Sequence, residues 1–166
     1  SGLSCPVGFK NSTHGDIQVA VDAVKSAAHP HIFPSVTKEG TSAIFSTSGN
    51  EDCHIILRGG GGKTNYDSES IGHAKKTLLD SGLDHRLMVD MSHANSEKKH
   101  ENQLRVCDDL CGQIANGEEG IIGVMIESNL VAGKQDLGDG TGLVYGQSVT
   151  DACIGWDDTA SALKML

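Results

Sequence analysis

The sequence predicts an α/β protein built on a parallel β-sheet that is covered by helices. Short apolar runs alternate with amphipathic segments along the chain. The apolar runs have no polar face, which is typical of strands that βα crossovers bury on both sides. Hydrophobic side chains make up 37% of the 166 residues and glycine adds 21 more, a composition that favours a folded domain over disorder.

The first part of the chain is expected to hold a strand, a helix and a hairpin. The strand covers residues 6–9. The helix covers residues 16–28, with Asp16 as N-cap, because apolar residues recur there at helical spacing. Two β-like runs at residues 31–37 and 42–47 then predict a hairpin.

The second part is expected to repeat strand and helix. Apolar runs predict strands at residues 53–57, 86–91 and 121–126, and amphipathic spacing predicts helices at residues 68–81, 96–116 and 158–166. The helix at residues 68–81 is expected to bury Leu79, and the helix at residues 96–116 is expected to bury Ile114. Residues 127–150 are polar and rich in glycine, and we expect a long loop there.

Charge and composition exclude several classes of function. The formal net charge of −9 disfavours binding to nucleic acid or to an anionic membrane. No apolar stretch approaches the roughly 20 residues of a membrane span, and the start lacks the features of a signal peptide. The five cysteines are odd in number and widely spread, so free thiols and a cytoplasmic protein are expected. Gly62-Lys63-Thr64 is not a P-loop, because Leu57 replaces the required earlier glycine.

Polar residues follow each of the four expected parallel strands. Carboxyl ends of parallel strands meet at one edge of a sheet, where ligands bind. Lys10 and Arg58 suit an anion. His93 and Glu127, with Asp151 or Asp90, offer the donors of a divalent metal site. Strand-end charges can equally be solvated and histidines structural, and the separations fit no local metal motif, so the residues alone leave both interpretations open.

Five motifs identify a family that the chain resembles. They are SGLSCPVGFKN at residues 1–11, HIILRGG at 54–60, VDMSHANS at 89–96, GVMIESN at 123–129 and YGQSVTDACIGW at 145–156. In this order they resemble the microbial, feedback-regulated 3-deoxy-D-arabino-heptulosonate 7-phosphate (DAHP) synthases, over essentially the whole chain.

The resemblance implies a (β/α)8 barrel, a fold of about 250 residues. The chain would then be one partial catalytic domain over residues 1–166, the carboxyl-terminal half with strands five to eight. The hairpin at residues 31–47 would be the family's insertion before strand six. Because a half-barrel has two open sheet edges, the chain alone is expected to be aggregation-prone and inactive.

The resemblance also implies a reaction and its residues. The family condenses phosphoenolpyruvate with erythrose 4-phosphate, the first step toward the aromatic amino acids, and needs a divalent metal of the Mn, Fe, Co or Zn type. His93, Glu127 and Asp151 match three metal ligands, and the fourth, a cysteine, lies upstream together with the aldose-phosphate site. Lys10 and Arg58 match residues that hold phosphoenolpyruvate. Lys10 and His93 are the expected catalytic residues, with Lys10 as a proton donor.

Regulation is implied in the same way. Four residues match an effector pocket of the phenylalanine-sensitive members: Leu3, Ser4, Phe33 and Ser35. Pro34 and Phe45 differ from the residues most common at these positions in such members, which leaves the identity of the aromatic effector open. The full-length protein is expected to form a homodimer or homotetramer. Two rival interpretations are a related synthase that uses arabinose 5-phosphate and a non-catalytic half-barrel that regulates a partner.

Overall fold

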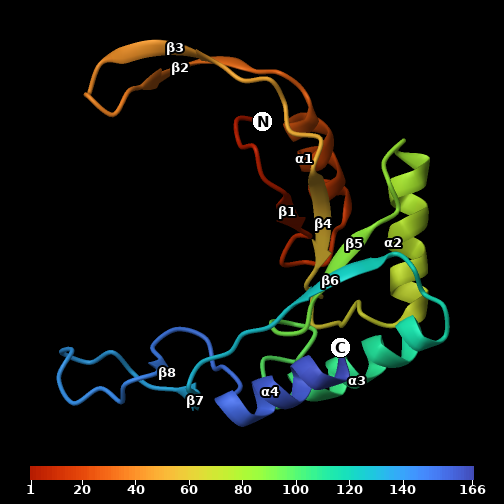
Figure 1. Ribbon diagram of the computed structural model, residues 1–166, viewed down its shortest axis with the longest axis vertical. Helices are drawn as coiled ribbons and strands as arrows, with labels where there is room; N and C mark the ends of the chain where they lie inside the picture. The colour runs from red at the N-terminus through yellow and green to blue at the C-terminus, as the bar shows by residue number, and fades with distance from the viewer.

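A four-stranded parallel sheet lies at the centre of the computed structural model, which describes all 166 residues. Its strands are β1 (Val7–Lys10), β4 (Cys53–Leu57), β5 (Leu87–Asp90) and β6 (Ile121–Met125), in that order. Every neighbouring pair is parallel. The structure thus confirms the predicted α/β class, and Figure 1 shows the strands running side by side through the middle of the molecule.

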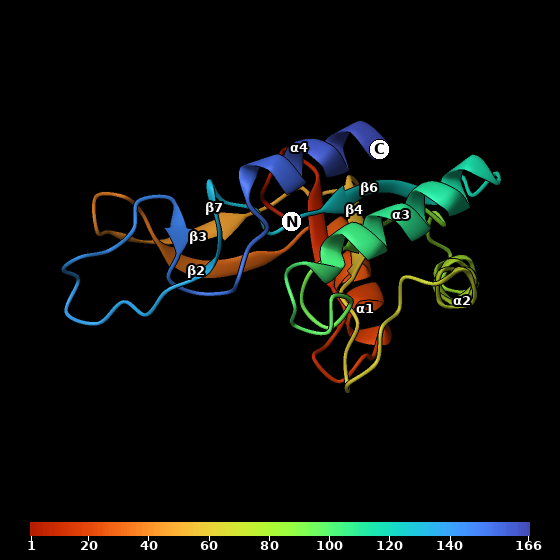
Figure 2. The same cartoon turned by 90° about the horizontal axis from the view of Figure 1, so that it is seen from below.

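Three helices connect these strands, and a fourth lies against the third. They are α1 (Gln18–Ala28), α2 (Ser68–Asp80), α3 (Asn102–Ala115) and α4 (Trp156–Met165). Alternate strand residues such as Ile55, Leu57 and Val89 belong to one buried cluster with apolar residues of all four helices. The Cys107 thiol on α3 donates to the Ala162 carbonyl on α4 over 3.7 Å. The turned view in Figure 2 shows α3 and α4 side by side.

The opposite face of the sheet is less completely covered. His54 and Met88 alternate with the core residues of β4 and β5, and the His54 Nε2 atom lies 3.0 Å from the Met88 sulfur. Both side chains are half-buried. Partial burial lowers the pKa of His54, because desolvation disfavours the charged imidazolium.

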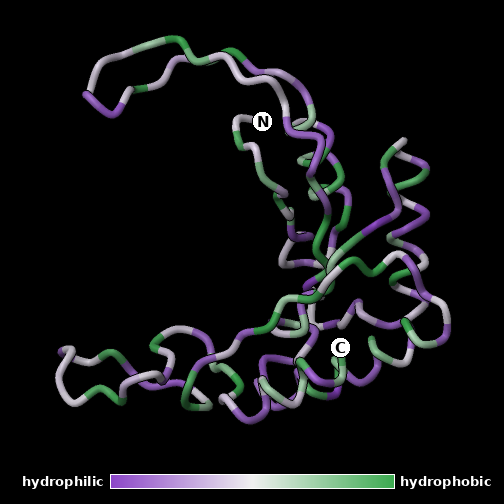
Figure 3. The backbone as a smooth tube through the Cα atoms, in the orientation of Figure 1, coloured by the Kyte–Doolittle hydropathy of each residue, from purple (hydrophilic) through white to green (hydrophobic).

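Two arms project from the sheet. The first is the predicted hairpin, β2 (Ile32–Val36) and β3 (Ser42–Ser46), where Phe33 pairs with Phe45 and their rings stack at 6.1 Å. The second contains β7 (Val131–Lys134) and the short β8 (Gln147–Ser148). The long loop expected at residues 127–150 therefore contains two short strands that the sequence analysis did not predict. Figure 3 shows hydrophobic segments in both arms as well as in the sheet.

The structure corrects the starts of three helices. The last of them, expected from residue 158, begins at Trp156. The helix expected at residues 96–116 begins at Asn102, because Glu97 and Lys98 have φ angles of 56° and 61° that no α-helix can accommodate. The helix expected from Asp16 begins at Gln18, with Ile17 in the N-cap position. The Asp16 carboxylate still accepts a hydrogen bond from the Gln18 amide at 2.9 Å.

Two residues assigned to buried stripes are exposed. Leu79 is 58% exposed and Ile114 is 43% exposed. Both lie in the last turn of their helix. Leu78, directly before Leu79, is buried instead, and successive residues of a helix point about 100° apart.

Both edges of the central sheet are open. β1 pairs only with β4, and β6 pairs only with β5. Each edge strand therefore carries a row of backbone groups that could pair with a further strand. No helix of the structure combines the length and the apolar character needed to cross a membrane.

We predict that Asp67→Ala lowers the free energy of unfolding by about 1 kcal/mol. Asp67 is the N-cap of α2, and its carboxylate accepts from the Ser70 amide at 2.9 Å and the Ser70 hydroxyl at 2.7 Å. Urea denaturation of the full-length protein measures the change. The matched control is Asp80→Asn at the other end of α2, where a negative charge opposes the helix dipole. Equal losses for both variants would contradict the capping role.

Candidate active site

The carboxyl edge of the sheet brings the expected polar residues together. Lys10 ends β1, Arg58 directly follows β4, and Glu127 follows β6 by two residues. His93 follows β5 by three residues, and Asp151 arrives from the segment after β8. The parallel arrangement explains this convergence, because all strands end at the same edge.

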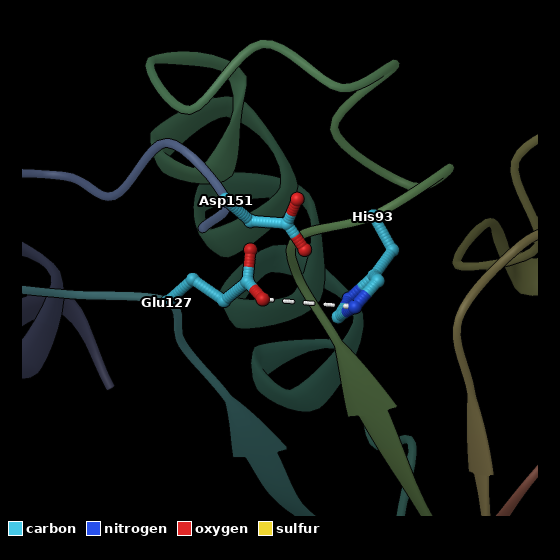
Figure 4. Close-up of side chains that lie close together, drawn as sticks. All are labelled: His93, Glu127 and Asp151. Carbon is cyan, nitrogen blue, oxygen red and sulfur yellow. Dashed lines mark ion pairs between the residues drawn. The ribbon is translucent and has the colours of Figure 1, made fainter. Parts of the chain in front are cut away.

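His93, Glu127 and Asp151 form a compact cluster. One ligand atom from each lies within 4.8 Å of the others, and His93 Nε2 is 3.6 Å from Glu127 Oε1. Figure 4 shows the imidazole and the two carboxylates meeting from three different segments. One nitrogen and two carboxylate donors in this arrangement can hold a divalent transition metal.

The backbone at His93 is locked in an uncommon conformation. Its φ angle is 54°, in the left-handed region that non-glycine residues rarely adopt. The Lys98 amide donates to the His93 carbonyl at 2.9 Å, and the Ser96 hydroxyl donates to it at 3.1 Å. Such strain persists only where the surroundings enforce it, and it concentrates at functional sites.

A buried glutamine fixes the backbone of Glu127. Gln103 of α3 is fully buried. Its Nε2 donates to the Glu127 carbonyl at 3.0 Å, and its Oε1 accepts from the Glu127 amide at 2.9 Å. These two hydrogen bonds tie the backbone of Glu127 to α3.

The carboxylate of Asp90 lies directly beneath the edge and is fully buried. Lys10 Nζ donates to it at 2.8 Å, and the Ser92 hydroxyl donates at 2.7 Å. Burial by itself would raise the pKa of Asp90, but the hydrogen bonds from Lys10 and Ser92 outweigh it and hold the pKa below its ordinary value. Asp90 is therefore an ionised carboxylate.

Arg58 has an unsatisfied buried donor. Its Nε atom is buried and has no hydrogen-bond partner. Such an orphan donor is costly unless a ligand satisfies it. Its backbone amide is fixed by Asn11 Oδ1 at 2.8 Å. A planar guanidinium that is held in place with an unused donor suits a phosphate or carboxylate.

Three asparagines that the sequence analysis did not select hold the loop after Arg58. Asn11 Nδ2 donates to the Gly59 carbonyl at 3.0 Å, Asn65 Oδ1 accepts from the Gly59 amide at 2.6 Å, and Asn95 Oδ1 accepts from the Asn65 amide at 2.8 Å. Gly59 has a φ of 67°, and a Cβ there would lie 2.8 Å from the Lys63 carbonyl oxygen. Hydrophobic periodicity gives no sign of these polar residues. The available signal was their position after strands, since Asn11 directly follows β1 and Asn95 lies five residues after the end of β5.

A pocket of about 970 Å³ opens between these groups. Its walls include Arg58, His93, Glu127 and Asp151, together with the glycines at residues 59–62, and only two of its 16 lining residues are hydrophobic. Lys98 and Lys134 also line it. A pocket with so many charged groups and so little apolar wall suits a small, highly charged ligand.

All five cysteines are free thiols, as expected. Cys153 lies closest in sequence to the cluster, two residues after Asp151. Burial raises the pKa of its thiol, a hydrogen bond with Ser148 lowers it, and the charges of Glu127 and Asp151 raise it further. Cys153 is not part of the group of ligand atoms that gather around His93.

The residues expected to bind an effector lie on two segments. Leu3 and Ser4 are exposed, and Phe33 is 41% exposed on the hairpin. The Ser1 hydroxyl lies 2.8 Å from the Thr47 hydroxyl at the base of that hairpin, so the N-terminal segment runs close to it.

The fold and the site define a class: a parallel α/β protein whose carboxyl edge carries an arginine with an unpaired buried Nε and a His-Glu-Asp cluster that could hold a metal ion. The model of the DAHP synthetase I family matches residues 1–164. The chain belongs to this family.

Individual proteins similar to this chain also carry the name of this family's enzyme. The chain is 57% identical over 166 residues to the Phe-sensitive phospho-2-dehydro-3-deoxyheptonate aldolase of Escherichia coli K12, and 49% identical to the Trp-sensitive one of Salmonella typhimurium. Each alignment covers all of this chain and 47% of the relative. The solved structure of the Francisella tularensis SCHU S4 enzyme of that name aligns with a TM-score of 0.94 at 50% identity.

The alignment with that structure covers 99% of this chain and 48% of the solved chain. The chain thus spans about half the length of the curated relatives it matches.

We predict that Glu127→Gln weakens binding of Mn²⁺ to the full-length protein by at least tenfold, since it removes one of the two carboxylates of the cluster. Isothermal titration calorimetry of metal-free protein measures the dissociation constant. Glu119→Gln is the matched control, because Glu119 is exposed and precedes the same strand that Glu127 follows. Unchanged affinity in Glu127→Gln would show that the cluster is not the metal site.

Proposed function

We propose that this chain is the carboxyl-terminal half of a (β/α)8-barrel DAHP synthase. The full-length protein would condense phosphoenolpyruvate with erythrose 4-phosphate and release phosphate, the first step toward the aromatic amino acids. The observation that carries the proposal is the orphan Nε of Arg58 at the same sheet edge as the His-Glu-Asp cluster. Family membership supports it, as do the printed names of the relatives.

The open edges support the half-barrel. β1 and β6 each lack a neighbour on one side, and closing a barrel takes parallel strands at both edges. The upstream half of the protein would supply those strands, the fourth metal ligand and the aldose-phosphate site that the family resemblance implies. Residues 1–166 would then be part of one catalytic domain.

The donor set fits the metal that the family implies. His93, Glu127 and Asp151 supply one imidazole nitrogen and two carboxylates within 4.8 Å, a combination that suits divalent Mn, Fe, Co or Zn. When bound, the ion would supply Lewis-acid polarisation of the aldehyde oxygen of erythrose 4-phosphate.

The chain's own residues would bind and orient phosphoenolpyruvate. The Arg58 guanidinium would neutralise its phosphate or carboxylate through the free Nε donor. Lys10 uses one of its three N–H donors on Asp90 and keeps two for the substrate. These contacts would orient phosphoenolpyruvate so that its C3 attacks the aldehyde carbon. Water would then add at C2, and phosphate would leave.

Feedback control is part of the proposal. The N-terminal segment and the hairpin would bind an aromatic amino acid through Leu3, Ser4, Phe33 and Ser35. Phenylalanine is favoured over tryptophan, because the Phe-sensitive relative is 57% identical and the Trp-sensitive one 49%. The full-length protein would be a homodimer or homotetramer.

The first test measures phosphate release from phosphoenolpyruvate by the full-length protein when erythrose 4-phosphate is added. We expect release that a chelator abolishes and added Mn²⁺ restores. Arabinose 5-phosphate is the control sugar. Release with arabinose 5-phosphate alone would assign the related five-carbon synthase. No release with either sugar from folded, metal-loaded protein would leave the fold standing and favour a non-catalytic regulatory or decayed protein.

A second test addresses Lys10. If Lys10 donates a proton, Lys10→Arg lowers kcat by at least about a hundredfold, because a guanidinium keeps the charge but does not give up its proton. Steady-state kinetics on the full-length protein measure it, with binding of Mn²⁺ expected to stay within about threefold. Lys75→Arg, on α2 and paired with Glu118 at 2.6 Å, is the control. Normal turnover in Lys10→Arg would exclude the proton-donor role.

A further inference from the structure

One carboxylate oxygen of Asp90 contacts both Lys10, the proposed substrate ligand, and His93, the proposed metal ligand. Asp90 Oδ2 lies 2.8 Å from Lys10 Nζ and 2.8 Å from His93 Nδ1. Asp90 Oδ1 accepts from the Ser92 amide at 2.9 Å and from the Ser92 hydroxyl at 2.7 Å. The side chain is 0% exposed, so these protein groups, and not water, satisfy it.

This contact selects one tautomer of His93. The Ser92 hydroxyl lies 2.7 Å from Nδ1 and gives its own proton to Asp90 Oδ1, so it can only accept from a proton on Nδ1. Asp90 Oδ2, 2.8 Å from the same nitrogen, favours this tautomer because a lone pair on Nδ1 would face a negative oxygen. The lone pair is therefore on Nε2, the atom that lies 3.6 Å from Glu127 Oε1 and that a metal would need.

The same contact fixes the Lys10 ammonium. The Lys10 side chain remains 30% exposed, so without Asp90 its flexible stem would let the charge move into solvent. Holding one N–H in place reduces the entropy lost when a substrate binds the other two.

We propose that Asp90 is a positioning residue that sets the metal-binding nitrogen of His93 and the substrate-binding ammonium of Lys10 with one buried carboxylate. The inference rests on the proposed function, in which Lys10 holds phosphoenolpyruvate and His93 holds a divalent ion. Its consequence is that one substitution, at a residue that touches neither ligand, weakens both kinds of binding.

Asp90→Asn is the sharpest substitution. All four groups at the Asp90 oxygens can donate: Lys10 Nζ, His93 Nδ1, and the amide and hydroxyl of Ser92. A carboxamide of the same shape has an NH₂ in place of one oxygen, so in either orientation it faces at least one donor. The volume is conserved while the charge and half of the acceptor capacity are lost.

The experiment compares full-length wild-type protein with Asp90→Asn by calorimetry. We expect the dissociation constant for Co²⁺ to rise ten- to a hundredfold, and that for phosphoenolpyruvate at saturating metal to rise roughly tenfold. Asp84→Asn is the matched control, since Asp84 precedes the same strand, is 50% exposed and pairs with Arg86. A folded Asp90→Asn protein with both constants within twofold of wild type would overturn the proposal.

A merely structural role gives a different result. It would lower the Tm of Asp90→Asn and leave the Co²⁺ dissociation constant, measured well below Tm, unchanged. Neither calorimetric constant needs turnover, so an inactive wild-type protein would reject the proposed reaction without deciding the role of Asp90.

A measurement on the wild type decides the matter if Asp90→Asn does not fold. In metal-free protein with ¹⁵N-labelled histidine, at a pH where the His93 ring carries a single proton, we expect its nuclear magnetic resonance signals to show a slowly exchanging proton on Nδ1 and a bare Nε2. A proton on Nε2 with a bare Nδ1 would overturn the assignment of Asp90.

Discussion

Parallel hydrogen bonding among the four strands of the central sheet is the constraint on which the site depends. Because all four strands run the same way, residues far apart in sequence leave the sheet at one edge. Lys10, Arg58, His93 and Glu127 reach that edge because each lies at or shortly after the end of a strand. The sheet determines their proximity, and the loops after the strands need only orient them.

Orientation comes from buried polar side chains below and beside this edge. Gln103 fixes the backbone of Glu127, and the asparagines at residues 11, 65 and 95 hold the loop after Arg58. Asp90 combines these roles, because its charge is buried and fully hydrogen-bonded. Burying such a charge is favourable only when its partners are in place. The same partners keep the site rigid before a ligand arrives.

Both arms lie away from these buried polar contacts. The stacked Phe33 and Phe45 rings are on a hairpin that projects from the sheet, and the segment with β7 and β8 projects on the side of α4 (Figure 1). These elements carry exposed apolar side chains. In the proposed full-length barrel, the edge strands would be paired by the upstream half, which would also complete the metal site.

The sequence by itself determined the α/β class, the order of the four central strands and the four helices, the hairpin and the strand-end polar residues, because apolar periodicity and strand-end placement are local properties. It did not predict β7 and β8. It misplaced the start of α3, since the positive φ angles of Glu97 and Lys98 leave no periodic signal. It also gave no sign that Leu79 and Ile114 would be exposed. The family resemblance implied that His93, Glu127 and Asp151 belong to one site, and only the tertiary structure showed their distances, the shared oxygen of Asp90 and the orphan Nε of Arg58. The physical reason is that hydrogen bonding and metal ligation depend on distances of a few ångströms between segments that sequence spacing does not relate.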